Sequence, residues 1–349
     1  MKTKTLLVLG DNKDFDTYKK IIRQKRFFNG SSIAVKSADY ESVLAGRFPN
    51  ISTATIIILP CFPFVYWDKH IEPKKYKGVY GNKSFYAKFN VFWKKTEKKI
   101  NNFYKKKKLI FINELKNLAL DRDKENVKML VSKRGVSIPK RYNTRNLKSI
   151  LKIIDDGKKL FVKVRYGSMG KGITYLEKKK WMTNFRFRKG KIQCRKSDYG
   201  WSFVNCTNNL KFLKNLLKQE IIIEEAIDSL IINKRKFDLR LYVYKNRILY
   251  AYGRTAPADS ITTNISQGAR GEKTSFVKKL PKKQLERAKK QAVLSIKALG
   301  LNFGGVDLML CPDKKNVKFI EVNTFPGFPR VRRFNLSKYL INEIIMEFK

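Results

Sequence analysis

Two short apolar segments near the end of the chain each carry oxygen-bearing side chains in their interior. The first, GGVDLML, contains Asp307, and the second, FIEVN, contains Glu321 and Asn323. Residues two apart on a β-strand face the same side of a sheet, so Glu321 and Asn323 project together. A hairpin turn through Pro312–Asn316 would bring Asp307 beside them. Two carboxylates and an amide are ligands for Mg²⁺ ions that also bind nucleotide phosphates, although a solvent-exposed hairpin face is the alternative.

Length and composition set limits on the architecture. A chain of 349 residues is long enough for two or three domains. The longest apolar run, TIIILP, has the length of a strand and not of a membrane span, and the apolar segment at the start is too short for a secretory signal. No paired cysteine spacing occurs among Cys61, Cys194, Cys206 and Cys311, and a single histidine, His70, cannot form a zinc site alone. These features indicate a reduced, cytoplasmic protein.

The chain is strongly basic, with 77 Lys and Arg against 29 Asp and Glu and a formal net charge of +48. Such an excess strengthens salt-dependent association with polyanions. Lysine clusters at 94–99 and 105–108 fit a nucleic acid, an acidic peptide or a polyphosphate as partner. A general richness in Lys, Asn and Ile explains the charge equally well. No helix-turn-helix, RNP or zinc-finger pattern is present, so a dedicated nucleic-acid-binding function is not expected.

Strand and helix patterns alternate in the first part of the chain and mix in the second. Strands at 5–10, 32–36 and 55–59 with a helix near 15–27 predict a small α/β domain with a parallel sheet. Residues 72–108 have no clear period. Further on, the pattern predicts helices over 123–134, 208–218, 282–299 and 336–348, strands over 160–164, 172–177, 220–226, 236–244 and 247–256, and a loop over 257–275.

A glycine-rich segment, FVKVRYGSMGKG, places Lys163 on a strand just before a loop. The loop contains Gly167, Gly170 and Gly172, which would let backbone N–H groups approach phosphate oxygens, while Lys163 supplies a fixed positive charge. The segment matches neither the GxxxxGK[ST] loop nor a strand-to-helix GxGxxG unit, and a plain β-turn is the alternative.

Charged residues also end or interrupt three other apolar strands. Glu224 and Glu225 close the run IIIEE, where a carboxylate would accept hydrogen bonds from a ribose or orient an adenine. Asp238 and Arg240 share one face of a strand, and Arg254 ends the next strand. Arginines that face a metal-bound phosphate stabilise charge during phosphoryl transfer. Solvated acids and a cross-strand salt bridge are the competing interpretations.

The order of these motifs resembles the ATP-grasp superfamily, and within it the RimK-like carboxylate–amine ligases. The resemblance covers roughly residues 120 to 330. In it, DRDKENVKMLVSKRGVSIPK is similar to the segment before the central domain, FVKVRYGSMGKG to the phosphate-covering loop, IIIEEAI to the adenine hinge, and KFDLRLYVY with GRTA to the paired central strands. The most specific motif is VDLML with FIEVNTFPGF, which resembles the Mg²⁺ site.

The resemblance implies an ATP-grasp fold of the α/β (α+β) class. A small N-terminal α/β domain with a parallel sheet, over 1–115, would precede an ATP-grasp domain over 116–349. Two α+β lobes, at about 140–225 and 226–349, would grip ATP.

The same resemblance implies roles for individual residues. Asp307, Glu321 and Asn323 would carry Mg²⁺, with Mn²⁺ as an alternative ion. The residues expected to act in catalysis are Arg254, Lys163 and Arg240. The residues expected to bind the nucleotide are Lys124, Lys163, Gly167, Ser168, Gly170, Gly172, Glu224, Glu225, Ala226, Asp238 and Asn264.

The sequence also departs from the family pattern. Ala226 stands where an aromatic residue is often found, which leaves the packing of the adenine open. An insertion of about four residues in IDSLIINKRKFD affects the placement of Asp238. The basic segment 178–206, which includes Trp181, Tyr199 and Trp201, has no clear counterpart.

The implied function is ATP-dependent ligation of a carboxylate to an amine through an acyl phosphate. The amine would be an amino acid or peptide, and an acidic peptide or carrier protein would suit the basic surface. One alternative is an ATP-grasp kinase of a polyanionic small molecule such as an inositol polyphosphate. A second alternative is a non-catalytic polyanion-binding protein on the same scaffold.

Overall fold

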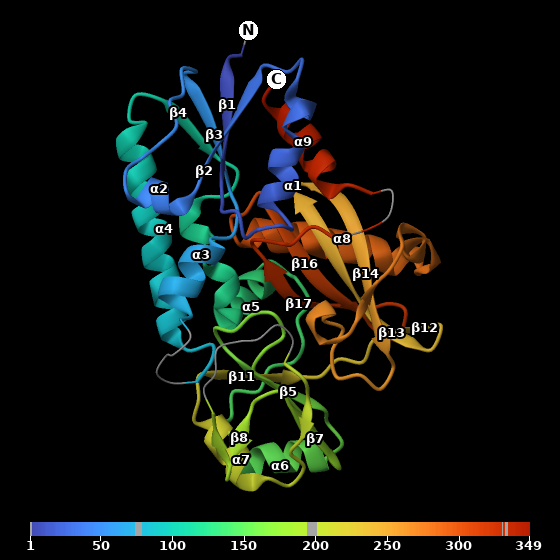
Figure 1. Cartoon of the computed structure of the whole chain (residues 1–349). Coiled ribbons are helices and arrows are strands. Elements are labelled where there is room, and N and C mark those ends of the chain that lie inside the picture. The colour runs from blue at the N-terminus through green and yellow to red at the C-terminus, as the bar shows by residue number, and fades with distance from the viewer. Residues whose placement is uncertain (1, 74–78, 194–200, 330, 332–333) are drawn as a thin grey trace.

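The computed structural model describes residues 2–73, 79–193, 201–329, 331 and 334–349 of the chain. Its first sheet is parallel, with the strand order β2-β1-β3-β4 (Figure 1). The strands are β1 (Lys4–Leu9), β2 (Ile33–Ala38), β3 (Thr55–Pro60) and β4 (Lys108–Phe111). Nearly every residue of β1 and β3 is buried, as expected for parallel strands covered on both faces. The predicted parallel sheet is confirmed.

The helix predicted over 15–27 is broken in two. It consists of α1 (Tyr18–Arg23) and a 3₁₀ turn over Lys25–Phe28. The carboxylate of Asp14 accepts hydrogen bonds from the backbone N–H groups of Thr17 and Tyr18, at 2.8 and 3.1 Å. These bonds satisfy N–H groups that a helix start leaves unpaired, so α1 begins after Asp14 and not with it.

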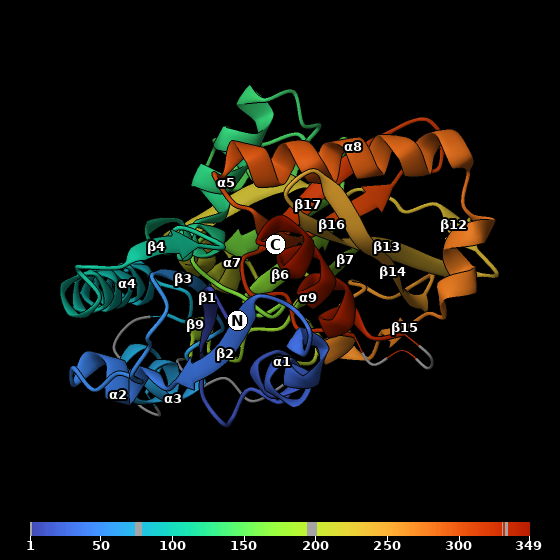
Figure 2. The same cartoon turned by 90° about the horizontal axis from the view of Figure 1, so that it is seen from above.

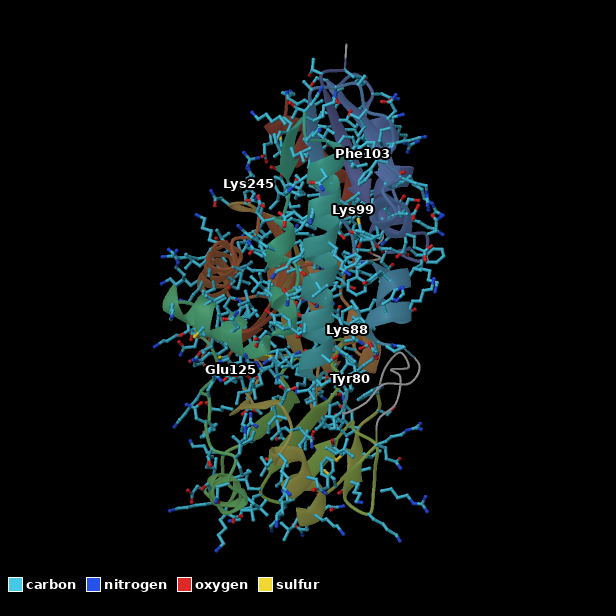
Figure 3. All side chains as sticks on the ribbon, turned by 90° about the vertical axis from the view of Figure 1, so that its left-hand side faces the viewer. Tyr80, Lys88, Lys99, Phe103, Glu125 and Lys245 are labelled. Atoms are coloured by element: carbon cyan, nitrogen blue, oxygen red, sulfur yellow. The ribbon has the colours of Figure 1, made fainter. Side chains whose placement is uncertain are left out.

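The longest helix, α4 (Lys83–Phe103), lies in the segment 72–108 for which the sequence predicted no element. Its buried face carries Phe85, Phe89, Phe92 and Trp93, and Phe89 lies three or four residues from each of the others. Lysines on the other face, including Lys88 and Lys99 in Figure 3, alternate with these aromatic residues and obscure the helical period. Two short helices, α2 (Tyr40–Leu44) and α3 (Phe64–Tyr66), lie beside α4 in Figure 1.

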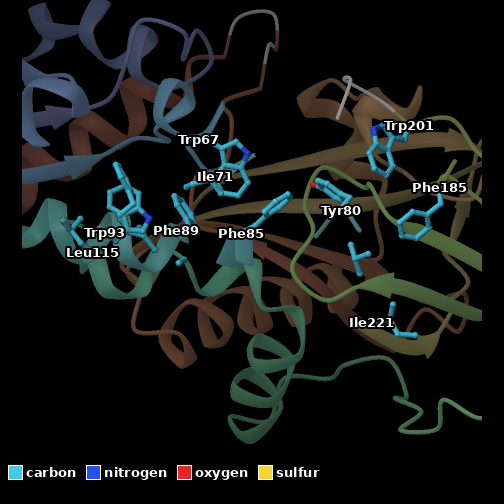
Figure 4. Close-up of a cluster of buried hydrophobic side chains, with 14 of the residues drawn as sticks. Trp67, Ile71, Tyr80, Phe85, Phe89, Trp93, Leu115, Phe185, Trp201 and Ile221 are labelled. Carbon is cyan, nitrogen blue, oxygen red and sulfur yellow. The ribbon is translucent and has the colours of Figure 1, made fainter. Parts of the chain in front are cut away.

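An aromatic cluster joins α4 to the smaller antiparallel sheet (Figure 4). Phe89 contacts Trp67 and Trp93 with ring centroids 5.1 and 5.5 Å apart. The cluster continues through Tyr80, whose ring lies 5.0 Å from that of Trp201. The first sheet and the smaller sheet therefore share one continuous core.

The smaller sheet has the order β10-β7-β6-β5-β11 and is antiparallel. Two helices pack near it, α6 (Leu147–Asp155), which the sequence did not predict, and α7 (Leu210–Leu217). Cys194 and Tyr199 lie outside the described residues. The strands are β5 (Leu160–Val164), β6 (Ile173–Glu177), β7 (Lys180–Thr183), β10 (Val204–Asn205) and β11 (Ile221–Glu225), and a separate hairpin joins β8 (Phe187–Arg188) to β9 (Lys191–Ile192).

The third sheet, also antiparallel, has the order β15-β14-β13-β16-β17. Figure 2 shows α8 (Lys282–Ala298) along one face and α9 (Leu336–Glu347) on the other side. A further helix, α5 (Lys124–Lys133), packs beside α8. The strands are β12 (Ile231–Ile232), which pairs with β13 (Arg235–Tyr244), then β14 (Arg247–Pro257), β15 (Arg270–Gly271), β16 (Phe303–Leu310) and β17 (Val317–Asn323).

Alternation along β13 separates the two faces of this sheet. Leu239 and Leu241 pack in the core formed with α8, whereas Tyr242 packs in the core that contains α9 and β1. Asp238 and Arg240 share the face of Tyr242, so they lie on the side turned away from α8. The predicted α+β class is confirmed.

A β-bulge in β17 sets which side chains share that face. Asp307 pairs with Glu321, but Leu308 pairs with Phe319, so Ile320 is the extra residue. Phe319 and Val322 both pack in the core with α8. Without the bulge, Glu321 would share the face of Phe319, because residues two apart point the same way.

Two further observations bear on the composition arguments. Cys61, Cys206 and Cys311 are buried free thiols. Among the described residues, no helix combines the length and the apolar character needed to cross a bilayer.

Candidate active site

A cavity of about 280 Å³ lies between the smaller antiparallel sheet and the third sheet. Strands from both sheets, helix α5 and the loop after β14 contribute its walls. Of the residues predicted to bind nucleotide or metal or to act in catalysis, those that line it are Lys124, Lys163, Ser168, Gly170, Glu224, Glu225, Ala226, Asp238, Arg254, Asn264, Asp307 and Glu321. Residues far apart in sequence therefore meet at one cavity.

At one end of the cavity, two arginines and two carboxylates form a buried network. Arg254 binds both oxygens of Asp238, at 2.6 and 2.7 Å, and also donates to Asp307 at 2.8 Å. Arg240 binds both oxygens of Asp307, each at 2.7 Å. The salt bridge between β13 and β14 that the sequence offered as an alternative is thus present. Burial raises the pKa of Asp307, but the two guanidinium groups lower it to about 2.

Glu321 and Asn323 lie beside this network. They share one face of their strand, as the sequence predicted. Glu321 is the register partner of Asp307, and its carboxylate lies 4.0 Å from Arg240. Burial and the Asp307 charge raise the pKa of Glu321. Asn323 pairs with Gly305, next along β16, and does not line the cavity itself.

These three residues fit a divalent cation. A carboxylate offers about four lone pairs, and the three bonds from the arginines leave Asp307 with acceptor capacity. The neighbouring carboxylates of Asp307 and Glu321 repel each other, and a divalent cation between them would offset that repulsion. Among the described residues, no three His, Cys, Asp or Glu side chains form a metal-binding group, so a third protein ligand beside Asp307 and Glu321 would have to be of another type, such as the Asn323 amide oxygen.

A second part of the cavity wall is cationic. Lys124, the first residue of α5, contacts the carbonyl oxygen of Gly167. Burial lowers its pKa to about 8, although Glu321 acts in the opposite direction. The preceding residue, Asp123, caps α5 by accepting from Asn126 N–H at 3.1 Å and binds Arg165 at 2.7 Å. This arrangement fixes the start of α5 against the end of β5.

A buried carboxylate holds two further lysines. Lys163 on β5 donates to Glu224 on β11 at 2.6 Å, and Lys128 of α5 contacts the other carboxylate oxygen. Burial raises the pKa of Glu224, but the two ammonium groups lower it to about 2. Lys163 also lies 4.8 Å from the ring centroid of Phe161.

Part of the remaining lining is apolar and lies near the predicted hinge. Phe161, Ile222, Met309 and Ile320 contribute side chains from both sheets. Ala226 follows β11, and its N–H donates to the Lys159 carbonyl at 2.8 Å. Flat apolar walls of this kind accept an aromatic base. Phe161, from the neighbouring strand, provides an aromatic ring near a hinge that lacks one.

The glycines of the predicted phosphate loop have different surroundings. A Cβ on Gly167 or Gly172 would lie 2.3 or 2.7 Å from the Val164 side chain, so these two glycines allow close packing and do not line the cavity. A Cβ on Gly170 would lie 2.2 Å from Asn264 Nδ2. Gln267 donates to the Gly170 carbonyl at 2.7 Å, which ties the loop to the segment after β14.

Lys128 and Thr263 are among the lining residues that the sequence did not predict. Lys128 follows Lys124 by one helical turn and faces inward with Val127 and Val131, so a lysine on an apolar stripe was the available signal. Thr263 donates to Asp238 from the loop after β14, and nothing in the local sequence distinguishes it from its neighbour Thr262.

Comparisons with known proteins agree with this geometry. A family model described as YheC/D like ATP-grasp matches residues 123–343. A probable alpha-L-glutamate ligase of Vibrio parahaemolyticus serotype O3:K6 is 26% identical over 219 residues, which cover 62% of this chain and 60% of that protein. One from Coxiella burnetii (strain Dugway 5J108-111) is 25% identical over 240 residues, or 68% and 66%. The chain thus spans less than two thirds of these relatives.

Solved structures share the fold over the whole chain. The ATP-grasp ligase PsnB, in complex with a phosphomimetic variant of its minimal precursor, Mg and ADP, has a TM-score of 0.58 at 13% identity and 100% coverage of both chains. The macrocyclase MdnC, bound with precursor peptide MdnA from Microcystis aeruginosa MRC, has 0.57 at 13%, with 98% and 99% coverage. Together with the family match, these findings establish that the chain belongs to the YheC/D-like ATP-grasp family.

Proposed function

We propose that this protein is an ATP-dependent carboxylate–amine ligase that releases ADP. The observation that carries the proposal is the convergence of Lys124, Lys163 and Arg254 on one cavity that also holds Asp307 and Glu321. Cations suited to phosphates and oxygen ligands suited to Mg²⁺ meet there beside apolar walls suited to a base. Among the relatives, the names of probable alpha-L-glutamate ligases describe the same reaction class.

In the proposed reaction, a substrate carboxylate oxygen attacks the γ-phosphorus of ATP. The bond to the β,γ-bridging oxygen breaks, which yields an acyl phosphate and ADP. An amine then attacks the acyl carbon, phosphate leaves, and an amide bond forms with loss of the amine proton. Lys124 and Lys163 bind the triphosphate, and the N–H donors of Arg254 not used by Asp238 and Asp307 face the transferred phosphoryl group. Arg240, which was also predicted to act in catalysis, is not among the residues that line the cavity and instead holds Asp307.

Bound Mg²⁺ would neutralise charge on the β- and γ-phosphate oxygens, and Asp307, Glu321 and Asn323 would hold it. The protein supplies no covalent nucleophile in this scheme. Positioning and preorganised charge account for catalysis, as expected for phosphoryl transfer.

The proposed substrates are a small carboxylate or peptide and an amine such as an amino acid. The basic surface favours an acidic acceptor. PsnB and MdnC, which share the fold, are described with precursor peptides, so peptides belong in the substrate screen.

An ADP-release assay over pairs of carboxylates and amines, followed by mass measurement of the products, tests the proposal. We expect ADP release that requires both substrates and an amide product lighter than their sum by one water. A phosphorylated product without an amide would instead identify the kinase. Absence of both nucleotide binding and ADP release would favour the non-catalytic polyanion-binding protein.

Glu321→Ala tests the metal assignment. The rate of ADP release should fall by about 100-fold or more in this variant, because the ion that neutralises the phosphate charge would lose one of its carboxylate ligands. Since Glu321 is partly exposed, circular dichroism should show an intact fold. Glu286→Ala, on the exposed face of α8, is the matched control. Near-normal turnover in Glu321→Ala would contradict the assignment.

A further inference from the structure

One carboxylate in the cavity is shared by two lysines, only one of which the proposed mechanism uses. Glu224 is 1% exposed, and its Oε1 accepts from Lys163 at 2.6 Å. Its Oε2 contacts Lys128, which is 2% exposed. Lys128 reaches Glu224 from α5, one turn after Lys124.

A purely stabilising role accounts poorly for a lysine at position 128. Burying an ammonium group costs free energy, and replacing a buried ion pair by apolar residues is often neutral or stabilising. The neighbouring inward residues of α5, Val127 and Val131, are apolar. An apolar residue would therefore satisfy the packing of this helix at less cost.

The charges of the cluster suggest another role. Two ammonium groups share one carboxylate, so the cluster keeps one net positive charge next to the cavity. Lys128 occupies Oε2, which restrains Glu224 to a single oxygen for Lys163. If Lys128 were apolar, Glu224 would neutralise Lys163 fully and compete with any phosphate for its ammonium group. The restraint of Glu224 by Lys128 and the attraction of Glu224 for Lys163 are both strong because the surroundings are buried and of low polarity.

We propose that Lys128 is a positioning residue that holds Glu224 and thereby keeps the Lys163 ammonium group available to the phosphates of a bound nucleotide. This inference rests on the proposed nucleotide-binding function. It assigns Lys128 no contact with the nucleotide and no part in bond making.

Calorimetric titration of the full chain with Mg-ADP tests the inference without requiring turnover. Lys128→Met should weaken binding by about tenfold, because Glu224 then neutralises Lys163. In a Glu224→Gln background, adding Lys128→Met should change the affinity by no more than about twofold relative to Glu224→Gln alone, because Lys128 acts only through Glu224. The control Lys133→Met, on the exposed side of α5, should bind as the parent does.

Melting temperatures measured in parallel separate stability from positioning. A structural role predicts a lower melting temperature in Lys128→Met and a similar loss of affinity when Lys128→Met is added to the Glu224→Gln background, and that result would overturn the inference. Lys128→Met binding within about twofold of the parent would also overturn it while leaving the proposed function intact. If the parent itself fails to bind Mg-ADP or Mg-ATP, the proposed function fails and the inference with it.

Discussion

Shared carboxylates organise the cavity at the scale of single residues. Asp307 holds Arg240 and Arg254, and Glu224 holds Lys128 and Lys163. A buried carboxylate stays ionised only when it is paired, so each of the two fixes a pair of cations at the cavity wall. The sequence suggested arginines and a lysine near phosphates. Which carboxylate binds which cation depends on strand register, and the structure resolved that question.

Acid unfolding should report on the Glu224 cluster. Because the pKa of Glu224 is lowered from 4.5 to about 2 on folding, its stabilising contribution is complete above about pH 4.5 and is lost as the pH falls toward 2. The free energy of unfolding, measured with urea, should therefore decrease more steeply between pH 5 and 3 in the parent than in Glu224→Gln. Asp155→Asn, at the exposed end of α6, serves as the comparison. Equal slopes in the parent and Glu224→Gln would contradict the ion-pair account.

At the scale of secondary-structure elements, two features separate what could be predicted from what could not. The apolar patterns of β13 and β16 predicted both strands, and the expected hairpin placed Asp307 beside Glu321. The alternation of β17 changes phase at Ile320, where the bulge lies, and this phase change alone does not say whether Glu321 faces the cavity or the core. For α4, lysines on the exposed face masked the period of the buried aromatic residues, so the longest helix was missed.

The packing of α4 can be tested on its own. Phe89 is fully buried among Trp67, Phe92 and Trp93, and Phe89→Ala should lower the free energy of unfolding by about 3–5 kcal/mol. Val91, two residues away, is 48% exposed, and Val91→Ala should change that free energy by no more than about 0.5 kcal/mol. Urea unfolding of the two variants provides the comparison. A small loss in Phe89→Ala would show that the aromatic cluster does not support the helix.

At the scale of the whole molecule, the packing of the two chain ends favours the compact fold and the net charge opposes it. Leu340 and Ile344 of α9 pack in one core with Leu6 and Val8 of β1, and Lys4 donates to the Phe348 carbonyl at 2.9 Å. The last helix thus joins the first strand to the third sheet. The net charge of +48 opposes this compactness, because like charges repel across the surface.

Salt should therefore stabilise the protein. Raising NaCl from 20 to 300 mM screens surface repulsion and should raise the melting temperature by on the order of 3 °C. A variant with Lys88, Lys95 and Lys98 of α4 changed to Gln should melt higher at low salt and gain less from added salt, since these three lysines are exposed. An unchanged or lower melting temperature of the parent at high salt would argue that repulsion is already balanced locally.

The sequence by itself determined the parallel first sheet, the two strands that carry Asp307, Glu321 and Asn323, and the family, because apolar periodicity and short motifs are local properties. Only the tertiary structure decided the bulge at Ile320, the place of Lys128 against Glu224, and the division of Asp307 between two arginines. These depend on strand register and on which elements meet. Contacts between residues as distant as Lys128 and Glu224 leave no periodic trace in the chain.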